Sequence, residues 1–387
     1  MRDIAIVSIA RTPVGRANKG NLRDTRPDHM AGLVVKEALK RAKGLDPADI
    51  GDIAIGCAFP EGEQGMNVAR IAGFLADIPV EVPAITINRF CSSGLQAIAV
   101  AAGRIALGGI DVAVAGGVES MSMVPMGGNK PSAHPALLDR WPEAYASMGI
   151  TAELVAERFG ITREIQDEFA YDSNMKAAAA VREGRFRDEI IPVTTKVYTD
   201  EGPREVTVTD DEGPRAETTM EALAKLRPAF HAKGTVTAGN SSQVSDGAAA
   251  CVLMTLEKAE ELDLKPLAIF RHFTVVGVPP ELMGIGPIPA IRKLMEVSGL
   301  KIDDVDCYEV NEAFAAQAAY CVRELGLDPK KTNVNGGAIA LGHPLGGTGA
   351  VLTAKLLYEM QREDHKLGVV SMCIGGGMGA AGLFERQ

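Results

Sequence analysis

The sequence predicts an α/β protein made of two similar halves, each a mixed sheet covered by helices, with a long insertion in the first half. Short apolar runs typical of buried strands alternate with longer runs of helical character. Residues 119–256 have no counterpart elsewhere in the chain. The rest of the sequence repeats with a constant offset of 255 residues, which pairs Gly44 with Gly299, Asp49 with Asp304, Phe59 with Phe314 and Gly94 with Gly349.

The first element is an apolar run at residues 4–10, which is too short for a secretory signal and is expected to form a strand. Within each copy of the repeat we expect a helix, two strands, a glycine-rich turn, a helix and a further strand. The runs 53–55, 112–115 and 369–372 are continuously apolar, so their sheets are expected to be buried on both faces. Two such sheets related by a pseudo-dyad would share one helical layer and bring equivalent helix N-termini together.

The chain is expected to divide into an N-terminal α/β half (1–118), an inserted loop domain (119–256) and a C-terminal α/β half (257–387). A helical run at 162–183 in the insertion starts at Thr162, a suitable N-cap. The last part of the insertion is expected to rejoin the N-terminal half as a strand. The insertion as a whole is expected to form a lid or a binding surface.

Composition limits the class of protein. The 387 residues are 46% hydrophobic and 23% charged, which is typical of a globular protein with an ample core. A formal net charge of −10 argues against a nucleic-acid partner. The six cysteines are scattered and form no metal-ligand spacing, so neither disulfides nor a metal site is expected. No run could span a bilayer, and we expect a soluble, cytoplasmic protein.

Cys91 lies between the apolar run 84–87 and a helical run at 95–107. At a helix N-terminus, unpaired backbone N–H groups and the helix dipole favour an anion. This position therefore predicts a lowered thiol pKa and a thiolate near neutral pH. The alternative is a buried structural cysteine, which is the commonest state of a free cysteine.

Two further reactive side chains lie near the C-terminus, and the repeat places them beside Cys91. His343 lies in a glycine-rich run, 336–349, and is suited to take the thiol proton, although such runs also form plain turns. Cys373 ends an apolar strand and could move protons to and from a carbon acid. The glycines that follow Cys373 could bind an oxyanion through their N–H groups. They are not a dinucleotide site, because only five residues follow the G-x-G-x-x-G match.

Asn311 and Glu312 follow another apolar strand. Asn311 could hold a water molecule or orient His343 by a hydrogen bond, or it could be a helix N-cap, and both can hold at once. Glu312 is expected to be a carboxylate in the first turn of that helix, where the dipole favours it.

Four segments together resemble the thiolase family, and the likeness covers essentially the whole chain. They are Asn-Arg-Phe-Cys-Ser-Ser-Gly (88–94), Asn-Glu-Ala-Phe (311–314), Gly-His-Pro-Leu-Gly (342–346) and Cys-Ile-Gly-Gly-Gly-Met-Gly (373–379). The segments 235–243, 246–248 and 283–287 look most like degradative members, which cleave 3-ketoacyl-CoA in bacterial fatty-acid β-oxidation. The resemblance implies a five-layered α-β-α-β-α fold with a loop domain inserted in the first half.

The resemblance also implies roles for particular residues. Cys91 would be the acylated nucleophile, His343 its base and Cys373 the acid/base at the acetyl-CoA carbon. Asn311 would hold a water that forms one oxyanion hole with His343, and the N–H groups of Cys91 and Gly375 would form a second. Contacts with CoA are implied for Met148, Arg215, Phe230, Ala238, Ser242 and Phe314.

The implied activity is CoA-dependent cleavage of 3-ketoacyl-CoA to acetyl-CoA and a shortened acyl-CoA through an acyl-enzyme. One alternative is acetoacetyl-CoA synthesis, which Ser147 weakens because relatives with that activity have a histidine there. Another is a non-catalytic carrier of CoA esters or lipids, which would not need paired thiols. CoA would be a substrate, with no permanently bound cofactor. The resemblance further implies a homodimer or homotetramer and a possible hydratase/dehydrogenase subunit, without membrane insertion.

Overall fold

The structure, a computed structural model, describes residues 2–387. Its main strands are β1 (Ile4–Arg11), β2 (Gly15–Arg16), β3 (Asp52–Gly56), β4 (Ala84–Ile87), β5 (Val112–Ser120), β8 (Ser245–Thr255), β9 (Ala268–Gly277), β10 (Cys307–Val310), β11 (Leu367–Ile374) and β12 (Met378–Glu385). They form two mixed halves, ordered β1-β8-β5-β3-β4 and β9-β12-β11-β10, and β2 pairs with β8. Because β1 and β9 pair over two residues, the two halves join at one corner into a single 10-stranded sheet.

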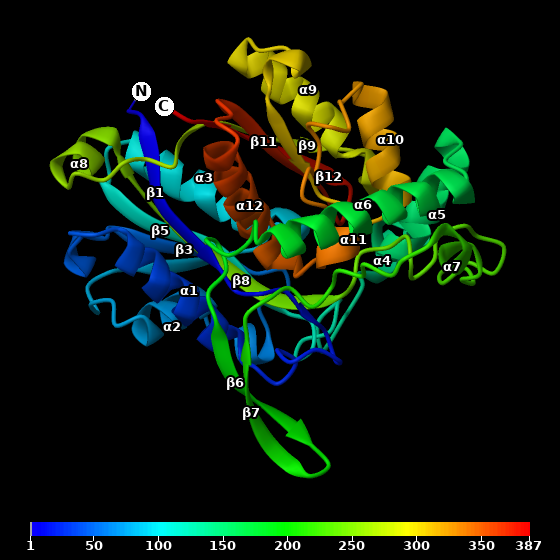
Figure 1. The fold of residues 1–387 in the computed structure, drawn as a ribbon, viewed down its shortest axis with the longest axis horizontal. Coiled ribbons are helices and arrows are strands. Elements are labelled where there is room, and N and C mark those ends of the chain that lie inside the picture. The colour runs from blue at the N-terminus through cyan, green and yellow to red at the C-terminus, as the bar shows by residue number, and fades with distance from the viewer. Residues whose placement is uncertain (1) are drawn as a thin grey trace.

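The helices form three layers around these sheets (Figure 1). One outer layer holds α1 (Pro27–Arg41) and α2 (Val68–Leu75) against the N-terminal sheet, and the other holds α9 (Pro287–Ser298) and α10 (Ala315–Leu325) against the C-terminal sheet. The central layer consists of α3 (Ser93–Ala106) and α12 (Thr348–Arg362), whose leucine and isoleucine side chains share one apolar cluster with both sheets. Burial of apolar surface on both sides of each sheet explains the continuously apolar strands. The prediction of two similar mixed-sheet halves in five layers is confirmed.

The two central helices begin at Ser93 and Thr348, which are separated by the same 255 residues as the sequence repeat. A 3₁₀ turn, η3 (Phe90–Ser92), leads into α3, and the equivalent turn η7 (Leu345–Gly347) leads into α12. Their N-terminal ends are in direct backbone contact. A Cβ atom built on Gly94 would lie 2.8 Å from the Ala350 nitrogen, and one on Gly349 would lie 2.3 Å from the Leu95 nitrogen. Only glycine permits this approach, which brings the two halves together at the site.

Two elements differ from the expected order within the repeat. The helix α2 separates β3 from β4, because residues 68–75 bury one apolar face and expose Phe74 and Leu75. The C-terminal copy has no strand equivalent to β4, and an isolated bridge between Tyr308 and Thr332 stands at that place. The sequence around Thr332 is polar and rich in glycine and asparagine, which disfavours a strand.

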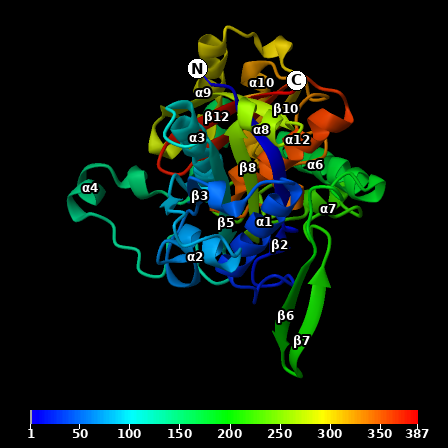
Figure 2. The same cartoon turned by 90° about the vertical axis from the view of Figure 1, so that its left-hand side faces the viewer.

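The insertion leaves the N-terminal sheet after β5 and returns at β8. It contains α4 (Pro135–Arg140), α5 (Met148–Phe159), α6 (Arg163–Glu183), α7 (Met220–Ala224) and a hairpin of β6 (Val193–Thr199) and β7 (Gly202–Val208), which projects from the body in Figure 2. The Thr162 hydroxyl accepts a hydrogen bond from the Ile165 N–H, so the predicted N-cap is confirmed. Two short helices, α8 (Leu256–Glu261) and α11 (Ala338–Leu341), belong to the chain beyond β8. Among residues 2–387, no helix has the length and apolar character needed to cross a membrane.

Candidate active site

Cys91 lies in the turn η3 between the edge strand β4 and the helix α3. The turn is sharp, since Phe90 adopts a left-handed φ of 41°, and hydrogen bonds from Phe90 N–H to Asn88 Oδ1 (2.8 Å) and from Ser93 Oγ to Phe90 O (2.6 Å) hold it. The side chain of Cys91 is only 6% exposed and packs among Ala17, Ala58, Met121 and Leu345. The Gly375 N–H faces its sulfur and favours the thiolate.

Burial raises the pKa of the Cys91 thiol to about 11, although the N–H groups of Gly375 and of Cys91 itself act in the opposite direction. The negative charge of Glu119 raises this pKa further. The predicted lowering of the thiol pKa by the helix N-terminus is therefore wrong, because desolvation outweighs the few N–H donors. The resting thiol is neutral, so a thiolate requires a base beside it.

His343 is buried in the turn that precedes α12. Its backbone N–H donates to Gln243 O (3.1 Å), and its Nδ1 lies 2.6 Å from Thr348 Oγ1. Its Nε2 lies 3.4 Å from Asn311 Nδ2. An amide N–H can only donate, so Nε2 carries the lone pair and Nδ1 carries the proton, donated to Thr348. Burial lowers the pKa of His343 to about 4, so the imidazole is neutral and able to accept a proton at neutral pH.

Cys373 is fully buried at the end of β11. The tight turn after it contains Gly376 and Gly377, both with left-handed φ, and this turn aims the Gly375 N–H at Cys91. Burial raises the pKa of the Cys373 thiol well above its usual value, and a thiolate at the neighbouring Cys91 raises it further. The structure thus brings the two predicted reactive thiols near enough for a charge on one to raise the pKa of the other.

Asn311 follows β10, and its N–H donates to Ser371 O (2.9 Å). It is not an N-cap, because α10 begins at Ala315 with Phe314 in the cap position. Its Nδ2 faces His343 instead, while its Oδ1 is buried without a protein partner among the residues that the structure describes. A buried oxygen in this state is suited to receive a hydrogen bond from a water molecule.

Glu312 is likewise not in a first helical turn, and that expectation is wrong. Its buried carboxylate accepts hydrogen bonds from Ser173 Oγ (2.6 Å), Asn333 Nδ2 (2.8 Å) and the Ile339 N–H (3.3 Å). Glu312 therefore connects the segment carrying Asn311 to α6 of the insertion and to the run that leads to His343.

The six residues expected to contact CoA lie in two groups. Met148 and Phe314 share an apolar cluster with Cys373, and the Phe230 ring meets the Phe314 ring edge-on at 5.8 Å. Ser242 joins this group through a hydrogen bond from its N–H to Ala313 O (2.9 Å). The second group lies farther out.

Arg215 and Ala238 form the second group, at a cavity of about 230 Å³. Arg215 is exposed, and Gln243, which accepts from the His343 N–H, lines the same cavity. Gln243 therefore links the cavity of the outer group to the backbone of His343.

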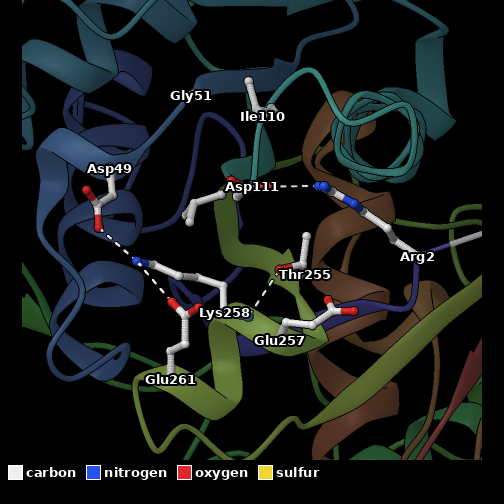
Figure 3. A pocket seen from close by; sticks show the side chains of 10 residues that line it. Arg2, Asp49, Gly51, Ile110, Asp111, Thr255, Glu257, Lys258 and Glu261 are labelled. Carbon is white, nitrogen blue, oxygen red and sulfur yellow. Dashed lines mark hydrogen bonds and ion pairs between the residues drawn. The ribbon is translucent and has the colours of Figure 1, made fainter.

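Another cavity, of about 520 Å³, lies beside α8 (Figure 3). Lys258 there pairs with Asp49 (3.3 Å) and Glu261 (3.7 Å), and Arg2 pairs with Asp111 (2.7 Å). Its lining holds no thiol or histidine, and its carboxylates do not favour a polyanionic ligand. Within residues 2–387, no three metal-ligating side chains gather at one point.

Comparison with known proteins identifies the family. The model of the thiolase N-terminal domain matches residues 4–257, and that of the thiolase C-terminal domain matches residues 264–386. The chain belongs to the thiolase family. This thiolase is 56% identical to a 3-ketoacyl-CoA thiolase of Bacillus subtilis, with 100% of each chain covered. It is 52% identical to a peroxisomal 3-ketoacyl-CoA thiolase of Homo sapiens, over 99% of this chain and 91% of that one.

Among solved structures, the thiolase is similar to the acetyl-CoA acetyltransferase of Bacillus anthracis, with a TM-score of 0.92 and 42% sequence identity. The match covers 100% of this chain and 99% of the other. The predictions of the family and of the fold class are confirmed. The roles assigned to single residues stay predictions.

Sequence reasoning missed two residues of the thiolase site. Thr348 is the first residue of α12 and fixes the His343 ring, and its signal was a hydroxyl within the glycine-rich run, five residues after His343. Glu119 is a lone carboxylate at the end of the apolar strand β5. In the sequence it marked only the first residue of the predicted insertion.

Proposed function

We propose that this thiolase is a 3-ketoacyl-CoA thiolase, which uses CoA to cleave 3-ketoacyl-CoA into acetyl-CoA and a shortened acyl-CoA in fatty-acid β-oxidation. The observation that carries the proposal is that two buried thiols and a buried histidine come from distant segments to one region. Gly375, two residues after Cys373, turns its N–H toward the Cys91 sulfur, and Leu345, two residues after His343, shares an apolar cluster with Cys91. The names of the B. subtilis and human relatives agree with it. A carrier without turnover would not need this arrangement.

In the first half-reaction, His343 Nε2 takes the Cys91 proton and the sulfur attacks the 3-keto carbon. The N–H groups of Cys91 and Gly375 stabilise the resulting oxyanion. When the oxyanion collapses, the C2–C3 bond breaks and its electron pair passes to the acetyl-CoA carbon. His343 and a water held on Asn311 Oδ1 stabilise the thioester oxygen of this enolate. Because its raised pKa keeps the resting Cys373 thiol protonated, this thiol can donate its proton to the carbanion and release acetyl-CoA.

In the second half-reaction, the Cys373 thiolate takes the proton of an incoming CoA thiol. The CoA sulfur attacks the acyl group on Cys91, whose carbonyl oxygen, the former 3-keto oxygen, stays with the N–H groups of Cys91 and Gly375. Cys91 leaves as a thiolate and regains its proton from His343, so that both thiols return to their resting state. The cycle predicts ping-pong kinetics.

The experiment is intact-protein mass spectrometry with a 3-ketoacyl-CoA and no free CoA. Wild-type protein is expected to gain the mass of one acyl group on Cys91 and to lose it when CoA is added. Cys91→Ala is expected to gain none and to have no thiolytic activity. Cleavage by Cys91→Ala at more than a trace of the wild-type rate would refute the assignment.

Acetoacetyl-CoA synthesis is the second candidate, favoured by the name of the similar B. anthracis structure. The same chemistry runs in either direction, so chain length separates the two. A kcat/KM for a long-chain 3-ketoacyl-CoA at or above that for acetoacetyl-CoA supports the degradative function. A strong preference for acetoacetyl-CoA supports the synthetic one.

The division into 1–118, 119–256 and 257–387 remains part of the proposal, with the insertion as the CoA-binding part. Arg215 at the rim of its cavity is suited to a phosphate of CoA, and the apolar group around Phe230 to pantetheine. Arg215→Ala is expected to raise the KM for CoA about tenfold while kcat changes less than twofold. An unchanged KM would remove Arg215 from the CoA path.

Assembly as a homodimer or homotetramer is supported by an exposed sheet edge. The strand β4 lies at the end of its sheet, and exposed apolar side chains surround it. They are Met66, Phe74, Leu75, Val80 and Ile85. Ile85→Lys is expected to shift the mass measured by light scattering toward the monomer. A hydratase/dehydrogenase subunit and a cytoplasmic location stay predictions from the resemblance.

A further inference from the structure

Glu119, at the end of β5, is a fully buried carboxylate that the proposed reaction does not use. Its Oε2 accepts hydrogen bonds from the N–H groups of Ala58 (2.8 Å) and Gly346 (2.8 Å). Its Oε1 accepts from the Phe59 N–H (3.2 Å) and from Gln64 Nε2. One side chain thus receives four N–H donors.

These donors belong to separate segments of the molecule. Ala58 and Phe59 follow β3 on the side of Cys91, and the Phe59 ring lies 6.0 Å from the ring of Phe90, the residue before Cys91. Gly346 lies in the turn η7, three residues after His343. Through Glu119, the turn that carries the base is tied to the segment that supports the nucleophile.

Backbone packing at this point leaves little room for another arrangement. A Cβ atom built on Gly346 would lie 2.5 Å from the Ala58 nitrogen, and one on Gly117 would lie 2.3 Å from the Gly346 oxygen. The Ala58 and Gly346 N–H groups therefore converge on one place, where a single acceptor oxygen can serve both. Without that oxygen, two buried donors lose their partner.

Burial raises the pKa of Glu119, whereas the hydrogen bonds from Ala58, Gly346, Gln64 and Phe59 lower it. Four N–H donors occupy both oxygens and suit the ionised carboxylate, because a protonated oxygen would itself need an acceptor. The group is therefore suited to hold N–H groups and poorly suited to transfer a proton.

We propose that Glu119 is a positioning residue: its carboxylate holds the His343 turn against the Cys91 segment and so sets the geometry in which the imidazole takes the thiol proton. The inference rests on the proposed acylation of Cys91. A carboxylate that served stability alone would change the amount of folded protein, but not the rate of acylation in each folded subunit.

Glu119→Gln tests the inference, because the amide keeps the size of the side chain but replaces one acceptor oxygen by an NH₂ group. The matched control is Glu359→Gln on α12, where another buried carboxylate accepts from Asn335 Nδ2 (2.7 Å) and Arg185 Nη1 (3.3 Å) outside the site. The measurements are the single-turnover rate of Cys91 acylation per subunit that can be acylated, the KM for CoA and the unfolding midpoint.

We expect Glu119→Gln to slow acylation at least tenfold while the KM for CoA stays within twofold of wild type. Glu359→Gln is expected to be acylated at a rate within twofold of wild type, even if its unfolding midpoint falls as far as that of Glu119→Gln. Acylation within twofold in Glu119→Gln, or an equal loss in Glu359→Gln, would overturn the inference. A wild-type protein that is not acylated on Cys91 would instead refute the proposed function.

If Glu119→Gln does not fold, Gln64→Met carries the test. It removes the side-chain donor and leaves the three backbone N–H groups on Glu119. A slowing of acylation between twofold and tenfold, with an unchanged KM for CoA, supports the positioning role. An unchanged acylation rate overturns it.

Discussion

Thr348→Val removes the hydroxyl that accepts the Nδ1 proton of His343 and leaves a side chain of nearly the same shape. The bond is 2.6 Å long and both residues are buried, so water does not readily replace the lost partner. A buried donor without a partner costs about 1–3 kcal/mol. The substitution therefore destabilises, by the same free energy, the neutral tautomer whose lone pair is on Nε2. The tautomer that carries its proton on Nε2 does not lose this hydrogen bond.

At about 1.36 kcal/mol per factor of ten, this cost corresponds to a decrease in kcat of about 5- to 150-fold. Steady-state kinetics with acetoacetyl-CoA and varied CoA measure it, and the KM for CoA should change less than twofold. Thr353→Val is the matched control, because its buried hydroxyl donates only to Gly349 O (2.7 Å) on the same helix. Equal kcat values for Thr348→Val and wild type, or an equal loss in both variants, would refute the reasoning.

Three further predictions follow from buried ionisable groups. Alkylation of Cys91 by iodoacetamide should keep accelerating as the pH rises toward about 11, and a plateau near pH 8 would contradict the raised pKa. Because the folded state lowers the His343 pKa from 6.5 to about 4, stability present above pH 6.5 should be lost as the pH falls toward 4. Urea unfolding should show a loss of about 3 kcal/mol relative to His343→Gln, which lacks this titration. Lys355→Met, which leaves buried Glu309 without its 2.9 Å partner, should cost about 3–5 kcal/mol, against less than about 1 kcal/mol for Lys36→Met in an exposed pair.

The sequence predicted the site because its residue types stand at points that local structure determines. Cys91 follows a strand and precedes a helix, and the same is true of His343 in the second half at the repeat offset. Two copies of one folding pattern pack about a shared helical layer, so equivalent turns must meet there. The convergence of Cys91, His343 and Cys373 on one region was therefore available from periodicity and spacing.

Three features escaped this reasoning because they depend on contacts between distant segments. Asn311 could not be distinguished from an N-cap until the start of α10 was known. Thr348 and Glu119 gain their roles only through partners, His343 in one case and Ala58 with Gly346 in the other. A hydroxyl or carboxylate in a sequence does not show which buried donors it will face.

The sequence by itself determined the two-half architecture and the family, and it predicted the reactive side chains, because strand and helix periods, the repeat and short motifs can be read along the chain. Only the tertiary structure decided their ionisation. A helix N-terminus predicts a thiolate at Cys91, but the surrounding apolar side chains remove water from the sulfur and raise its pKa to about 11. Desolvation depends on what packs around a group from every direction, and that is known only once the chain is folded.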